Sequence, residues 1–298
     1  MVKIGLALSG GGIKSFAQLP VIKVLESEKV RIEAVSGTSM GSVIAALFAT
    51  GISSDHVINL ALELEKEIKD KKIMTRPSAK ILPFVKDRLI GGFVDGYQLE
   101  EALDNKLQTL GIDNIRDVKI PLVINAVDVK SGNHVAFVSH PEKYKANSGE
   151  IVISDVKLST AVRASCSFPF VISAVEYEDM VLVDGGVRQN LPLDFVKSYG
   201  VDKTIAVTMH AKGYFDNVES LTSLGVRVMD LMRIEADQKI VAEADVHIDI
   251  PMDEVLIFDI GKGSDTMEIG ERAIQDYTES IRKLIQKKTI WDIFKIKK

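Results

Sequence analysis

Cysteine is nearly absent from this chain, and its scarcity narrows the possible chemistry. Only Cys166 is a cysteine among 298 residues, which excludes an intramolecular disulfide and a multi-cysteine zinc site. A reducing cytoplasm is the simplest compartment for such a chain, so we expect a cytoplasmic protein. We expect Cys166 itself to be a small buried residue.

Long apolar runs are also missing. No stretch approaches the roughly 18 apolar residues that span a bilayer. The apolar start of the chain, residues 1–8, is short for a signal peptide and leads directly into Ser9 and three glycines. We therefore predict a strand there. A composition of 46% hydrophobic and 27% charged residues is that of an ordinary globular protein.

Positive charge is in deficit except at the end of the chain. The net charge of -5 argues against general nucleic-acid binding. From Arg282 onward seven basic residues stand against Asp292, a local charge of +6 that leaves -11 for the remainder. The segment Ile281–Lys298 also alternates apolar and basic residues, including Trp291 and Phe294. It fits either a peripheral contact with the inner membrane face or a packed final helix with a lysine tail.

Short β-branched runs alternate with longer helical patterns, which predicts an α/β sheet covered by helices. The predicted strands are Lys3–Leu8, Ala34–Ser36, Leu122–Val127, His134–Val138, Val181–Val183, Thr204–Met209 and Val246–Ile250. The predicted helices are Gln18–Glu28, Gly41–Thr50, Ser54–Ile68, Gln98–Leu110, Ser159–Ala164, Leu193–Tyr199, Val218–Glu243 and Met267–Gln286. Lys69–Asp95 breaks the pattern and reads as a surface excursion or lid, with Gly91-Gly92 as a hinge.

The segment Gly37-Thr38-Ser39-Met40-Gly41 lies between a predicted strand and a predicted helix. Strand, G-x-S-x-G and helix together form the sequence pattern of a nucleophile elbow. Small residues let the chain make the strained turn, and the helix points its N-terminal amides toward the serine. Ser39 is therefore the candidate nucleophile.

Two other glycine-rich turns follow predicted strands. In Ser9-Gly10-Gly11-Gly12-Ile13-Lys14-Ser15, backbone amides can approach an anion closely. It departs from a dinucleotide loop because Ser15 replaces the third glycine, and Lys14 is too close to the glycines for a Walker A loop. An oxyanion loop and a plain tight turn remain. Asp184-Gly185-Gly186 is either an acid at the end of a strand or a hairpin turn.

Histidine is scarce, and none of the five residues occurs in a motif typical of a catalytic base. They are His56, His134, His140, His210 and His247. If Ser39 is a nucleophile, a carboxylate kept away from water can act as its base.

These pieces together resemble the patatin-like phospholipases. The glycine loop, the elbow and Asp184-Gly185-Gly186 occur in that family's order and rough spacing. So do Ala164–Pro169, similar to A-S-x-[SA]-x-P, and Asn190-Leu191-Pro192, similar to an N-x-P ending. The resemblance covers residues 4–200. It implies a three-layer α/β sandwich with a mostly parallel central sheet. On this basis residues 201–280 complete the same domain and residues 281–298 form a basic amphipathic tail.

The resemblance also implies roles. Ser39 resembles the nucleophile and Asp184 the base of a Ser–Asp dyad, with Gly10, Gly11 and Gly12 as the oxyanion loop. Lys14 stands where the family has Arg or Lys, whereas Ser15 replaces an expected glycine. Gly37, Gly41, Gly185 and Gly186 support the two turns. No metal or cofactor is implied.

The expected activity is hydrolysis of acyl esters of lipids, with a lipid or acyl ester as the partner and no nucleic acid. A thioesterase or acyltransferase with the same dyad is an alternative. Acyl-carrier transferases usually place histidine before the serine, where this chain has Thr38. A catalytically silent lipid-binding module is the alternative from another class, although the intact dyad and glycine loop weigh against it.

Overall fold

The computed structural model describes residues 2–74, 77–81, 90–210, 221–253 and 255–285. Within these residues nine strands form one sheet, in the order β5-β4-β3-β2-β1-β8-β9, with β7 paired to β3 and β6 to β7. The strands are β1 (Ile4–Leu8), β2 (Ile32–Gly37), β3 (Leu122–Asp128), β4 (His134–Val138), β5 (Ile151–Ile153), β6 (Val175–Tyr177), β7 (Met180–Asp184), β8 (Lys203–His210) and β9 (Val246–Pro251).

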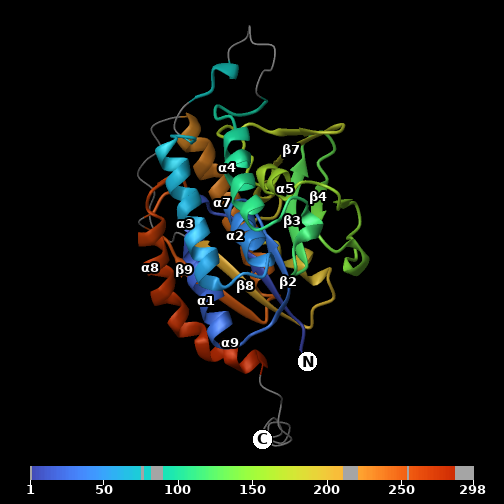
Figure 1. Cartoon of the computed structure of the whole chain (residues 1–298), viewed down its shortest axis with the longest axis vertical. Coiled ribbons are helices and arrows are strands. Elements are labelled where there is room, and N and C mark those ends of the chain that lie inside the picture. Colours follow the sequence, from blue (N-terminus) through green and yellow to red (C-terminus); the bar gives the residue numbers. More distant parts are fainter. Residues whose placement is uncertain (1, 75–76, 82–89, 211–220, 254, 286–298) are drawn as a thin grey trace, which may run out of the picture.

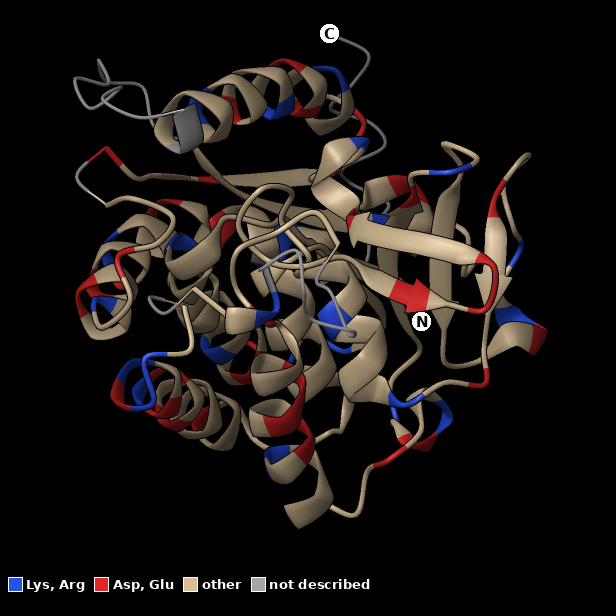
Figure 2. Cartoon of the chain, turned by 90° about the horizontal axis from the view of Figure 1, so that it is seen from above, with Lys and Arg blue, Asp and Glu red and all other residues tan. Residues whose placement is uncertain are grey.

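Helices cover both faces of the sheet, and Figure 1 shows α2, α3 and α4 in front of the strands. The α-helices are α1 (Leu19–Ser27), α2 (Met40–Ala49), α3 (Ser54–Asp70), α4 (Tyr97–Thr109), α5 (Leu158–Ser165), α6 (Leu193–Lys197), α7 (Leu221–Val241), α8 (Gly263–Ile274) and α9 (Thr278–Ile285). In Figure 2 the charged residues lie mostly on helices and loops, and the central strands are largely uncharged.

The alternation of side chains along a strand separates two cores. In β1, Leu6 and Leu8 join the larger core, which also contains buried residues of α1 to α5, whereas Ala7 points to the opposite face. That second core includes Phe195 of α6, with Val241 at the end of α7 packed against it. Because both faces are covered, β1 is apolar throughout and buried at every position.

The predicted fold class is confirmed, since five strand pairs are parallel and three are antiparallel. Two short strands, β5 and β6, were not predicted. The predicted helix Met267–Gln286 is instead α8, the 3-10 turn Gln275–Tyr277 and α9. β8 and β9 extend the sheet from β1, whereas the proposed division into domains stays a prediction.

The chain between α3 and α4 is partly described. Residues 75–76 and 82–89 of the predicted lid lie outside the described residues. The carbonyl of Gly91 accepts a hydrogen bond from the amide of Phe170 at 2.9 Å. A Cβ on Gly92 would lie 2.3 Å from the carbonyl carbon of Ile172. The glycine pair is thus packed against residues 170–172, and its action as a hinge stays a prediction.

Ile281–Ile285 form most of α9, where Ile281 is fully buried in the larger core. The Arg282 guanidinium donates to both carboxylate oxygens of Glu28, each at 2.6 Å. The start of the predicted tail is therefore a packed helix, and residues 286–298 lie outside the described residues. Among the helices that the structure describes, none combines the length and apolar character needed to cross a bilayer.

Candidate active site

Ser39 connects the end of β2 to the start of α2 in a conformation that side chains rarely adopt. Its φ of 53° and ψ of -132° are of the kind that costs about 1–3 kcal/mol and persists only where the surroundings enforce it. Hydrogen bonds on both sides of Ser39 hold this conformation. Its amide donates to Ser165 Oγ at 2.8 Å, and its carbonyl accepts from Ser42 Oγ at 2.6 Å. The Ser39 peptide groups are thus fixed at the N-terminus of α2.

The two glycines of the elbow are required by close approach of the backbone. A Cβ on Gly37 would lie 2.5 Å from the Gly41 carbonyl oxygen, and a Cβ on Gly41 would lie 2.4 Å from that of Ser9. Neither contact can be relieved by moving a flexible side chain. The elbow therefore packs backbone to backbone against the end of β1, which leads into the glycine loop.

Sheet register brings the two predicted catalytic elements together. Gly37 at the end of β2 pairs in parallel with Ile124 of β3, and Asp184 at the end of β7 pairs antiparallel with Ala126. β2 and β7 therefore approach the same edge of β3 from opposite directions and meet beside Asn125. Ser39 and Asp184 are 145 residues apart in sequence but occupy these two adjoining strand ends.

Asn125 ties the two strand ends together and was missed by the sequence reasoning. It is fully buried, accepts a hydrogen bond from Thr38 Oγ1 at 2.6 Å, and donates one to the Gln189 carbonyl at 2.9 Å. A Cβ on Gly185 would lie 2.5 Å from its side-chain nitrogen. An asparagine inside a predicted strand gives little sequence signal, because its importance depends on the partners that register supplies.

The Asp184 carboxyl is 1% exposed. Burial raises its pKa, whereas the charge of Arg233, the Ser39 hydroxyl and the Gly186 amide act to lower it. The Gly186 amide donates to Oδ1 at 2.8 Å. Oδ2 accepts no hydrogen bond from the described residues. The Ser39 hydroxyl acts on the carboxyl's pKa but does not donate a hydrogen bond to this oxygen. Such contacts are often long in unliganded sites.

The glycine loop lies directly against Ser39. A Cβ on Gly10 would be 2.9 Å from the Ser39 Cβ, and Gly12 has a left-handed φ of 57° with the Ile257 carbonyl only 2.0 Å from its hypothetical Cβ. The Gly10 amide donates to the Asn190 carbonyl at 3.4 Å. No hydrogen bond from the amides of Gly11 or Gly12 to another described residue is present.

α7 supplies two buried charged residues that the sequence did not single out. Arg233 donates to Asn190 Oδ1 at 2.7 Å, and its guanidinium carbon lies 6.0 Å from the centre of the Phe168 ring. Asp237 accepts from Asn190 Nδ2 and from the Leu191 amide, both at 3.0 Å. One face of α7 thus anchors the segment that follows Asp184. The pattern of charged residues along a helix does not reveal which of these residues are buried.

Lys14 belongs to the glycine loop but does not line the Ser39 pocket. It lines a separate small hollow with Gly10, Gly11, His210 and Asp230. Burial lowers the pKa of Lys14, and the charge of Asp230 partly opposes that effect.

The histidines do not converge on Ser39. Burial lowers the pKa of His210, but hydrogen bonds and charges of Asp237 and Asp249 outweigh it and raise that pKa to about 9. Its Nδ1 lies 2.9 Å from Asp249 Oδ1 and its Nε2 lies 3.8 Å from Asp237 Oδ2, so the ring faces these carboxylates. Within the described chain, no group of three or more His, Cys, Asp or Glu side chains could hold a metal ion.

A pocket of about 40 Å³ opens on Ser39 and is mostly apolar. Its lining includes Met40, Leu99, Phe168, Ile172, Ile257 and Phe258. Cys166 also lines it, and the prediction that this residue is buried is confirmed. Burial raises the pKa of the Cys166 thiol to about 12, so the thiol stays protonated and is a poor nucleophile.

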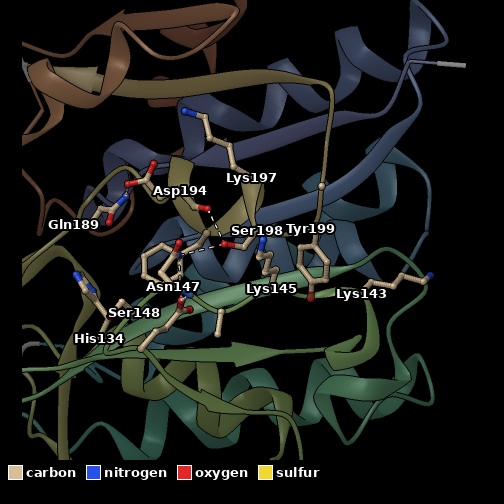
Figure 3. Close-up of a pocket in the computed structure, with 14 residues that line it drawn as sticks. His134, Lys143, Lys145, Asn147, Ser148, Gln189, Asp194, Lys197, Ser198 and Tyr199 are labelled. Carbon is tan, nitrogen blue, oxygen red and sulfur yellow. Dashed lines mark hydrogen bonds between the residues drawn. The ribbon is translucent and has the colours of Figure 1, made fainter.

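A larger hollow of about 770 Å³, which we call the lysine groove, lies away from Ser39. Figure 3 shows the side chains around it, including Lys143, Lys145, Lys197 and Tyr199. None of the predicted catalytic or oxyanion residues lines this groove. Gln189 lines the groove and also contacts the site, because its carbonyl accepts a hydrogen bond from Asn125.

The comparisons with known proteins agree on one family for this chain. The family model described as patatin-like phospholipase matches residues 6–197. YqhO of Bacillus subtilis, an uncharacterized protein, is 29% identical over 207 residues, which cover 67% of this chain and 69% of YqhO. Lysophospholipase NTE1 of Pyricularia oryzae is 26% identical over 207 residues, 68% of this chain but 12% of that protein.

The match to the relatives is partial in length. This chain spans 49% of an uncharacterized NTE family protein of Mycobacterium tuberculosis, at 26% identity. Among solved structures, VipD from Legionella pneumophila has a TM-score of 0.52 at 12% identity, covering 94% of this chain and 67% of VipD. At that identity the likeness concerns the fold alone. The family match supports lipid acyl hydrolysis as the general class of activity.

Proposed function

Because this chain belongs to the patatin-like phospholipase family, we propose that it cleaves acyl esters of lipids with a dyad of Ser39 and Asp184. The observation that carries the proposal is the meeting of β2 and β7 beside Asn125, which puts the elbow serine next to a buried carboxylate. The lysophospholipase name of a fungal relative makes a phospholipid or lysophospholipid a reasonable substrate class.

Asp184 takes the hydroxyl proton as Ser39 Oγ attacks the ester carbonyl. Its raised pKa makes the carboxylate a stronger base than an exposed aspartate, and Oδ2 has a free position for the proton. The alcohol then leaves with a proton, and the acyl group remains on Ser39. Asp184 gives its proton to that alcohol and is a carboxylate again. It then takes a proton from water as the water attacks the acyl-enzyme, and it returns this proton to Ser39 Oγ as the bond to the acyl group breaks and the fatty acid is released.

The amides of Gly11 and Gly12 are the proposed oxyanion donors. Gly12 lines the Ser39 pocket, Gly11 directly precedes it, and neither amide has a hydrogen-bond partner in the described chain, which supports this role. In other hydrolases the loss of one such donor costs about 3–4 kcal/mol of transition-state stabilisation. The Gly10 amide has the Asn190 carbonyl as a partner, so we assign Gly10 a steric role: it lets the loop approach Ser39.

The apolar pocket on Ser39 is the proposed acyl site. Its volume is only about 40 Å³, so a long chain requires side chains such as Phe168 or Phe258 to move. No histidine is needed as base. The same dyad would also serve a thioesterase or an acyltransferase, and these differ only in the group that leaves or accepts the acyl chain.

A fluorophosphonate probe tests the proposal directly. The wild-type chain should gain the mass of one probe, located on Ser39 by peptide mass spectrometry, and Ser39→Ala should gain none. Products released from a mixed lipid extract would then separate ester hydrolysis from thioester hydrolysis and acyl transfer. An unlabelled wild-type protein would favour the silent lipid-binding module.

A further inference from the structure

The outward face of α7 is apolar along its first half. Leu224, Val228, Leu231 and Met232 are 46%, 46%, 51% and 64% exposed. Their spacing of four, three and one residues places them in one stripe along the helix. Further along, the exposed positions are the polar residues Glu235, Gln238 and Lys239. The apolar stripe therefore belongs to a particular end of α7.

This stripe continues onto the segment that borders the Ser39 pocket. Phe170 is 61% exposed, and a Cβ on Gly225 of α7 would lie 3.9 Å from its ring. Phe93 is 52% exposed and is held beside it through a hydrogen bond from its amide to the Val171 carbonyl at 3.0 Å. We call Phe93, Phe170, Leu224, Val228, Leu231 and Met232 the apolar rim.

The rim and the pocket share the same elements. Phe168 and Ile172, on either side of Phe170, line the pocket, and Arg233 of α7 contributes to its wall. The inner face of α7 meanwhile holds Asn190 through Arg233 and Asp237. Contiguous exposed apolar side chains of this kind mark protein–protein, membrane or ligand interaction sites, and here they adjoin an apolar pocket.

We infer that the apolar rim docks on the surface of a lipid bilayer, so that an acyl chain passes from the membrane into the Ser39 pocket along apolar side chains. The inference rests on the proposed function only for the use of the pocket by a lipid ester. A lipid surface fits because the rim contributes large apolar side chains, and burying them in acyl chains removes this area from water.

Docking through apolar contact differs from docking through the basic tail. Salt weakens attraction between lysines and anionic lipids, whereas it leaves apolar burial intact. Rim binding should therefore occur on phosphatidylcholine vesicles and persist at about 0.5 M salt, where the Debye length is only a few ångströms. Tail binding should need anionic lipid and should decline with salt.

The test measures cosedimentation with sucrose-loaded phosphatidylcholine vesicles in a Ser39→Ala background, so that no vesicle lipid is consumed. Leu231→Ser with Met232→Ser should weaken binding about tenfold or more. Val129→Ser with Val152→Ser is the matched control, because both valines are exposed apolar residues on other elements, and it should bind like the parent. With Ser39 intact, both pairs should cleave a short soluble ester at near wild-type rate.

Several outcomes would overturn the inference. They are equal binding of rim and control variants, loss of binding only on truncation after Gln286, or a dimer that dissociates in the rim variant while vesicle binding is unchanged. If the double variant fails to fold by circular dichroism, Met232→Ser alone replaces it, since that side chain is the most exposed of the stripe. Inactivity on the soluble ester with intact vesicle binding would refute the dyad and leave the rim standing.

Discussion

The lysine groove and the Ser39 pocket differ in nearly every respect that bears on function. The groove measures about 770 Å³ and is lined by polar and charged residues, whereas the pocket measures about 40 Å³ and is mostly apolar. Size alone would favour the groove as the active site. Yet the strained Ser39 lines the pocket, and Gly12 of the glycine loop lines it too.

The contrast bears on where the proposed lipid chemistry takes place. A buried base with a raised pKa needs a setting from which water is excluded, and an open groove cannot provide one. The lysines of the groove remain near water, and Lys197 is paired with Glu243 at 2.7 Å. The proposed catalytic site is thus distinguished by backbone strain and desolvation rather than by volume.

The largest expected effect on activity comes from comparing the replacement of one serine in the Ser39 pocket with that of one serine in the lysine groove. Ser39→Ala should lower kcat/KM for a p-nitrophenyl ester by a factor of about 1,000 or more, because loss of an essential nucleophile typically costs several orders of magnitude. Ser148→Ala, in the lysine groove, should leave it within about twofold. If Ser39→Ala retains more than about a tenth of the activity, Ser39 is not the nucleophile.

Asp184→Asn should cost nearly as much as Ser39→Ala, since an amide cannot accept the serine proton. The double variant should be no worse than either single variant, because the two residues act as one unit. His210→Gln is the matched control for a histidine base and should retain most of the activity. Loss of activity in that variant together with an active Asp184→Asn would reverse the assignment.

Asn125→Asp should have a smaller effect with a distinctive pH dependence. We expect a fall in kcat of roughly tenfold, since a displaced catalytic group lowers the rate without abolishing it. The new negative charge beside Asp184 should raise that carboxyl's pKa further and move the acid limb of the rate profile to higher pH. A uniform loss at all pH values would indicate a purely structural role.

The fold and the elbow were predictable because their signals are local. Gly37, Ser39 and Gly41 lie within five consecutive residues. The strands β1, β3 and β8 are recognisable from the apolar residues in each run. β5 and β6, with three residues each, are too short to show a period. The break after Ile274 in the predicted last helix carries no proline or glycine to reveal it.

The surroundings of Ser39 and Asp184 were not predictable, because long-range register and burial define them. Asn125 becomes important only when β2 and β7 meet beside it, and Arg233 and Asp237 only when α7 packs on Asn190. The exposed stripe of α7 was likewise hidden, since leucines and methionines on a helix predict a core contact. The expected roles of Lys14, Gly185 and Gly186 stay predictions.

The smallest expected effect concerns stability and compares two aspartates. Burial raises the pKa of Asp184 above its ordinary value of 3.8, so the folded state binds that proton more tightly than the unfolded state does. The free energy of unfolding therefore falls as pH rises from about 4 through the raised pKa. Asp184→Asn removes this cost, and at about pH 8 it should raise Tm by a few degrees, at roughly 2 °C per kcal/mol.

The gain should shrink toward pH 4, and Asp194→Asn in the lysine groove should show no such gain. Differential scanning calorimetry at the two pH values measures both. A lower Tm for Asp184→Asn at pH 8 would mean that the attraction of Arg233 outweighs the burial of the charge.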